Sequence, residues 1–121
     1  MRAVQWSLPS DLGEPQVWVE VAKVEASLLR DLSTYVGPGA VNTGTQSRYA
    51  TIDHLMRRLG GAWMPHLNLD NGQIVFTDGR HRFAWARDHG AQAVLVTTCA
   101  QDAAALEALY GSPLRESLVE I

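Results

Sequence analysis

The chain has 121 residues, of which 46% are hydrophobic and 19% charged, and its net charge is −3. This length predicts one domain over residues 1–121, and the absence of an apolar stretch of about 20 residues excludes a membrane-spanning helix. The acidic balance argues against strong non-specific binding to DNA, and the lack of a signal-like apolar block near the start predicts a cytoplasmic protein.

The first part of the chain predicts two strands, a helix and a long loop. Alternating apolar and polar residues predict strands over 3–8 and 16–21, separated by a proline-containing loop over 9–15. Leucines at helical spacing predict a short amphipathic helix over 25–35. The stretch 37–50 contains three glycines and few groups to bury, which predicts a loop of a length typical of functional loops.

The rest of the chain alternates helices and strands. Apolar residues at i, i+3, i+4 and i+7 predict a helix over 52–59 that ends at two glycines. The segment 64–79 predicts a hairpin around Asp-Asn-Gly, and it is followed by a helix over 81–89, a buried strand over 91–99 and a helix over 101–111. We therefore expect an α+β (mixed α/β) fold, with a mixed sheet flanked by helices.

The segment FTDGRHRFAWARDHG concentrates charged and titratable groups between a strand and a helix. Asp78 and Gly79 form the turn, and the helix that follows directs its first backbone N–H groups at whatever lies over that turn. Arg80 and Arg82 can donate charge-assisted hydrogen bonds, and His81 can exchange a proton near neutral pH. Cations at a helix N-terminus oppose the helix dipole, so this arrangement predicts a site for an anion.

A purely structural interpretation competes with this site. Taken singly, each arginine is explained by a surface ion pair, but three cations in one turn favour anion binding. Phe83 and Trp85 are expected in the core, and His89 is expected to cap the C-terminus of its helix.

The sequence DGRHRFA resembles the signature of the ParB/sulfiredoxin-like superfamily. In sulfiredoxins the residue after the glycine is the catalytic cysteine, whereas here it is Arg80, which excludes the reductase activity. A closer resemblance is to the plasmid fertility-inhibition factors of the Osa and FiwA type. It rests on YVGPGAVNTGTQSRYA from Tyr35 and WMPHLNLDNGQIVFTDGRHRFAWARDHG from Trp63, and it spans roughly residues 35–99.

This resemblance implies a ParB/sulfiredoxin-like domain that binds nucleotide or DNA phosphates. Fertility-inhibition factors block conjugative or type IV secretion transfer, and ATPase and DNase activities are associated with the Osa type. The resemblance implies a phosphate-binding turn at Gly79, Arg80, His81 and Arg82, and a catalytic group made of Arg80, His81, Arg82 and Asp78.

The glycine-rich loop supplies a second group of candidate phosphate- or nucleotide-binding residues. The resemblance matches Asn42, Arg48 and Tyr49 to the family's polar and Arg-Tyr positions, where they would close over a nucleotide or a single strand, with Tyr49 stacking on a base. The alternative is that these residues only anchor the loop.

The expected cofactors are ATP or another nucleotide, with Mg²⁺ as a candidate ion, but no protein metal site is predicted because no pair of carboxylates has a metal-binding spacing. One hypothesis is a hydrolase of the NTPase or DNase type. The alternative is a non-catalytic inhibitor that binds a component of the conjugation or type IV secretion machinery. A third interpretation is an ordinary α+β domain in which the arginine turn is an internal ion-pair cluster.

Overall fold

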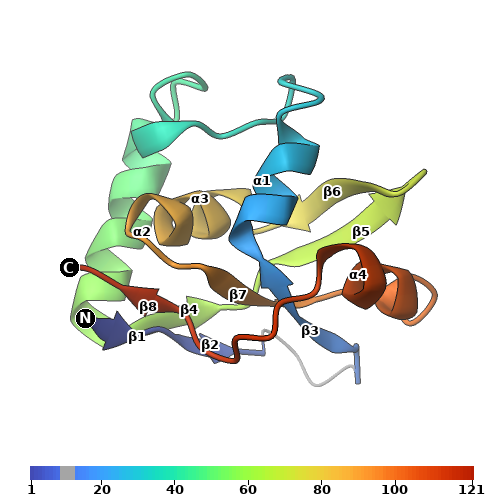
Figure 1. Ribbon diagram of the computed structural model, residues 1–121. Helices are drawn as coiled ribbons and strands as arrows, with labels where there is room; N and C mark the ends of the chain where they lie inside the picture. Colours follow the sequence, from blue (N-terminus) through green and yellow to red (C-terminus); the bar gives the residue numbers. More distant parts are fainter. Residues whose placement is uncertain (9–12) are drawn as a thin grey trace.

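The centre of the fold is a four-stranded mixed sheet with the strand order β3-β7-β5-β6 (Figure 1). The computed structural model describes residues 1–8 and 13–121, so part of the predicted loop over 9–15 lies outside the described residues. The four strands are β3 (Gln16–Glu20), β5 (His66–Asp70), β6 (Gln73–Asp78) and β7 (Ala93–Thr97). Strands β7 and β5 pair in parallel, whereas the pairs β3–β7 and β5–β6 are antiparallel.

Two small sheets join distant parts of the chain. Strand β1 (Arg2–Ala3) pairs with β8 (Leu118–Val119) antiparallel, and β2 (Gln5–Ser7) pairs with β4 (Gly61–Trp63) in parallel. The predicted strand over 3–8 is thus wrong as one element. It is interrupted at Val4, which is buried and donates its N–H to the carbonyl of Ser117.

Helices cover the central sheet. They are α1 (Val21–Leu28), α2 (Gln46–Leu59), α3 (Arg80–Asp88) and α4 (Ala103–Tyr110), with a short 3-10 turn at Pro38–Ala40. In Figure 1, α1, α2 and α3 gather on the upper side of the sheet, and α4 packs against β3. Phe83 and Trp85 on α3 are fully buried, as the sequence predicts. The α+β fold class is confirmed, and no helix in the described residues is long and apolar enough to cross a membrane.

The boundaries of two predicted elements are wrong. The helix expected over 25–35 is α1, which starts and ends earlier because its buried stripe is Val21, Val24 and Leu28 rather than the later leucines. Leu32, on which that expectation depended, is 64% exposed.

The loop expected over 37–50 is also too long, because α2 already begins at Gln46 with Thr45 as its N-cap. This shift places Arg48 and Tyr49 on a helix rather than in a loop.

The turn chemistry agrees with the sequence. Asn71 and Gly72 both have positive φ (51° and 78°), which is the two-residue hairpin turn that Asn-Gly favours. Gly60 ends α2 in the left-handed conformation. His89 occupies the C-cap of α3, and its Nδ1 lies 2.8 Å from the carbonyl oxygen of Trp85.

Candidate functional site

The turn between β6 and α3 requires a glycine. Gly79 has φ 84°, and a Cβ added there would lie 2.8 Å from both the Cα of Pro65 and Nη2 of Arg82. The first backbone bond of α3 runs from the N–H of Phe83 to the carbonyl of Gly79 (3.0 Å). The three N–H groups of residues 80–82 therefore have no intrahelical acceptor, and none of the described residues supplies another one.

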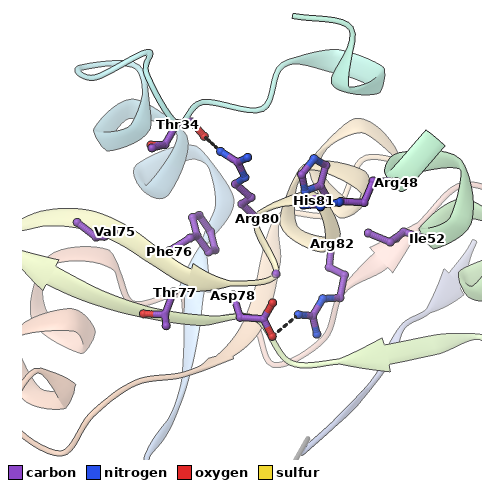
Figure 2. Close-up of a pocket in the computed structure, with 11 residues that line it drawn as sticks. Thr34, Arg48, Ile52, Val75, Phe76, Thr77, Asp78, Arg80, His81 and Arg82 are labelled. Atoms are coloured by element: carbon purple, nitrogen blue, oxygen red, sulfur yellow. Dashed lines mark hydrogen bonds and ion pairs between the residues drawn. The ribbon is translucent and has the colours of Figure 1, made fainter. Parts of the chain in front are cut away.

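A cavity of about 320 Å³ opens over this turn, and we call it the Gly79 hollow. It is formed by the loop after α1, one side of α2, the end of β6 and the start of α3 (Figure 2). Its lining residues are Thr34, Arg48, Ile52, Val75, Phe76, Thr77, Asp78, Gly79, Arg80, His81 and Arg82. The structure thus brings the whole predicted phosphate turn, together with Arg48, to one cavity.

Arg82 is already fully engaged by protein groups. Its Nη2 lies 2.9 Å from Oδ2 of Asp78, and its Nη1 donates to the carbonyl of Trp63 at 2.8 Å. The Arg82 side chain is only 13% exposed. Figure 2 shows it directed toward Asp78 and away from Arg80. The contacts of Arg82 therefore join the turn to the end of β4, and its guanidinium is neutralised by Asp78.

Arg80 and Arg48 differ from Arg82 in this respect. Nη1 of Arg80 donates only to a backbone carbonyl, that of Thr34, at 3.3 Å. Within the described part of the chain, no carboxylate lies within 4.0 Å of either guanidinium. Two positive charges without a negative partner on one cavity attract an anion.

His81 is the buried titratable group of the hollow. The residue is 5% exposed, and its Nε2 lies 2.7 Å from Oγ1 of Thr45. Burial lowers the pKa of His81 below its ordinary value, and the positive charges of Arg80 and Arg48 lower it further. The imidazole is therefore neutral at pH 7 when the hollow holds no anion.

Asn42 and Tyr49 lie outside the hollow and hold the loop in place. Oδ1 of Asn42 accepts the N–H of Gly37 at 2.7 Å, which closes the turn. The hydroxyl of Tyr49 donates to Oδ2 of Asp88 at 2.7 Å, and burial together with this carboxylate raises the pKa of Tyr49. These contacts correspond to the loop-anchoring alternative. Of the three loop candidates, only Arg48 faces the hollow.

The sequence analysis missed Thr45, although the sequence contains a signal for it. A threonine directly before a helix is a favoured N-cap, whose side-chain oxygen normally accepts a backbone N–H and contributes about 1 kcal/mol. Thr45 occupies the N-cap of α2 but makes no such bond. Its hydroxyl lies against His81 instead.

The carboxylates of the described residues do not fit a protein-held magnesium ion. Among the described residues, no group of three or more His, Cys, Asp or Glu side chains could hold a metal. Asp78 lines the hollow and is paired with Arg82. Asp53 accepts the indole N–H of Trp85 at 2.9 Å, and this bond, together with Arg57, holds the pKa of Asp53 below its usual value. We therefore assign no chemical step to a metal held by this chain.

Comparison with known proteins gives no match: no protein-family model, no curated protein and no solved structure is similar to this chain.

Proposed function

We propose that this protein binds a nucleotide through its phosphate groups in the Gly79 hollow and hydrolyses a phosphoanhydride or phosphodiester bond there. The observation that supports this most strongly is the pair of guanidinium groups, Arg48 and Arg80, that have no carboxylate partner in the described structure. They share one cavity with the three available N–H groups of α3. Backbone N–H groups and arginines are the donors that proteins use most often for phosphate.

Each group has a separate task in this proposal. The N–H groups of residues 80–82 donate to the non-bridging oxygens of one phosphate, and Arg48 and Arg80 neutralise the charge that develops on them. A water molecule forms the new bond to phosphorus, while the bond to the leaving oxygen breaks and its electrons stay with that oxygen. His81, neutral in the free protein, accepts the proton that the water loses.

The biological role follows the family resemblance. We propose a fertility-inhibition factor with a ParB/sulfiredoxin-like domain, which blocks conjugative or type IV secretion transfer. Candidate substrates are ATP, other nucleoside triphosphates and DNA. The net charge of −3 favours a nucleotide or a short single strand over a long duplex, because the chain lacks the basic surplus that duplex binding requires.

The test is turnover by matched variants. Purified protein is assayed for phosphate release from ATP and CTP and for nicking of plasmid DNA, with and without Mg²⁺. We expect R48A and R80A each to weaken nucleotide binding about tenfold, since each removes charge-assisted hydrogen bonds. R58A is the control, because Arg58 lies on α2 but does not line the hollow.

Two results would contradict the proposal. If the wild-type protein neither binds a nucleotide nor shows turnover, the proposed site is excluded. Equal loss in R58A and in the two hollow variants would show that the arginines act only through overall charge.

A second candidate function is supported by exposed apolar side chains on α2 and β4. Leu55 and Leu59 on α2 are 41% and 67% exposed, and Trp63 on β4 is 59% exposed. Exposed apolar side chains are typical of protein-binding surfaces where they gather into one patch. A non-catalytic inhibitor would use these side chains to bind a secretion component, so L59S and W63S would abolish inhibition of conjugation in donor cells while R80A would not.

A further inference from the structure

A chain of hydroxyl groups connects the backbone to His81, and its hydrogen-bond directions are fixed by its first member. Oγ1 of Thr43 lies 3.1 Å from the carbonyl oxygen of Ala40, which can only accept. A hydroxyl has one hydrogen, so Thr43 donates to Ala40 and must accept from Thr45, whose Oγ1 is 2.5 Å away. Thr45 has then also used its hydrogen.

The same reasoning fixes the proton on His81. Because the hydroxyl of Thr45 donates to Thr43, its oxygen can only accept from Nε2 of His81, which lies 2.7 Å away. The neutral imidazole therefore carries its hydrogen on Nε2 and a lone pair on Nδ1. No group in the described structure bonds Nδ1, yet no buried side-chain nitrogen or oxygen there lacks a partner. Nδ1 is accordingly not fully buried, and His81 is one of the residues that line the Gly79 hollow.

The local backbone holds the hydroxyl groups of Thr43 and Thr45 in this arrangement. Ala40 adopts a left-handed conformation (φ 59°), which is unusual for a residue with a Cβ, and its carbonyl also accepts the N–H of Thr45 at 3.3 Å. Gly44, with φ 68°, makes the turn between the two threonines. Thr45 makes no N-cap bond in α2, so its position is not explained by helix capping. Strained backbone and an unused cap are features that accompany functional geometry.

We propose that Thr43 and Thr45 are positioning residues that fix His81 in the Nε2–H tautomer, so that Nδ1 is the proton acceptor of the Gly79 hollow. Their role in hydrolysis rests on the proposed function, whereas the tautomer itself does not. The charged groups that face His81 are Arg80 from α3 and Arg48 from α2. The segment 40–45, which we call the threonine loop, adds no charge. In the part of the chain that the structure describes, no carboxylate pairs with the imidazole to favour the opposite tautomer.

The tautomer is measured directly by NMR on the full chain labelled with ¹⁵N-histidine. In a long-range ¹H–¹⁵N spectrum at pH 8, we expect His81 to show a protonated Nε2 and an unprotonated Nδ1. T45V should convert this pattern into a mixture of tautomers, and T45S, which keeps the hydroxyl, should restore it. T51V is the matched control, because the hydroxyl of Thr51 donates to Ser47 on α2.

Two outcomes overturn the proposal: wild-type His81 with its hydrogen on Nδ1 or evenly shared, or an unchanged tautomer in T45V. If T45V does not fold, T43V provides the same comparison. The tautomer of His81 in the wild-type protein is measured without any variant.

Turnover gives a second measurement. We expect T45V to lower kcat about tenfold with KM changed less than twofold, because the phosphate-binding groups remain. Equal kcat values for T45V and the wild-type protein would also overturn the positioning role. An inactive wild-type protein with the expected tautomer would instead contradict the proposed hydrolase function and leave the hydroxyl chain standing.

Discussion

The two ends of α3 carry arginines in opposite situations. At the C-terminal end, Arg87 is 11% exposed and is held by Asp88 (2.9 Å), by Glu25 (3.2 Å) and by the carbonyl of Val36 (2.6 Å). At the N-terminal end, Arg80 has a single contact with a carbonyl. Arg87 is thus paired with groups of the protein itself, whereas Arg80 is available to a ligand. The difference shows that the partners of an arginine, rather than its position in a cationic sequence, decide whether it stabilises the fold or marks a site.

The C-terminal end of α3 also determines the position of the threonine loop. Asp88 accepts hydrogen bonds from the hydroxyl of Tyr49, from the N–H of Gly39 and from Arg87. These bonds connect α2, α3 and the loop that contains Ala40. A stable network at one end therefore holds the loop that contacts His81 at the other end.

Removal of Asp88 should have the largest effect on stability. D88A leaves the Tyr49 hydroxyl without its acceptor and removes one of the two carboxylates that pair with Arg87. Breaking a largely buried ion pair costs about 3 kcal/mol. Urea unfolding followed by circular dichroism measures this loss. E20Q is the control, because Glu20 and Lys23 form an exposed pair whose loss should change the unfolding free energy by less than about 1 kcal/mol. Equal stability of D88A and E20Q would remove the contrast between the two ends of α3.

Substitution of the turn glycine should have the next largest effect. In G79A the alanine must adopt the left-handed backbone conformation, and its Cβ approaches Pro65 and Arg82 at 2.8 Å. We therefore expect the free energy of unfolding to fall by about 2 kcal/mol. G90A tests the conformation alone, since Gly90 also has positive φ but nothing within 4 Å of an added Cβ. Thermal unfolding should rank the wild-type protein above G90A and G90A above G79A. The reverse order of the two variants would show that the turn at Gly79 is not closely packed.

The pH dependence of sulfate binding should report the titration of His81 in the hollow. Sulfate remains a dianion through the neutral range, so it binds the imidazolium form better than the neutral form. Because the pKa of His81 lies below its ordinary value of 6.5 in the free protein and bound sulfate raises it, affinity should be highest at acidic pH. It should fall up to about tenfold per pH unit as pH rises above the free-protein pKa, and level off above the pKa of the complex.

Isothermal titration calorimetry between pH 5 and 8 measures how the sulfate affinity changes with pH. H81Q removes the titrating group, so its sulfate affinity should vary little over the same range. An identical slope in H81Q would assign the pH dependence to another group.

The fold could be predicted where the sequence has strong local signals. The Asn-Gly hairpin, the strand–glycine–helix turn at Gly79 and the buried face of α3 all follow from short patterns. The strands β4 and β8 could not be predicted, because they have three and two residues and exist only through pairing with the distant N-terminal segment. The start of α2 was missed because its first turn is polar, and its buried residue Met56 comes much later.

The sequence places the charged residues around the turn at Gly79, but it does not give the partners of the arginines. The sequence shows three cations near Gly79, but it does not show that Arg82 would turn toward Asp78 while Arg80 reaches the loop after α1. Nor does it show that Arg48 would lie on the opposite wall of the hollow, since that position depends on how α2 packs against α3. Pairing between side chains is a property of the tertiary structure, and it decides which charges remain for a ligand.

The proposed phosphate site consists of the start of α3 together with Arg48 and Arg80, which pair with no carboxylate among residues 1–8 and 13–121. Titration of the ¹⁵N-labelled protein with inorganic phosphate tests it most directly, because the amide resonances report contact residue by residue. We expect saturable shifts that are largest for the amides of residues 80–82 and for the side chains of Arg48 and Arg80. Shifts that do not saturate, or that centre on other residues while those of 80–82 stay unchanged, would contradict it.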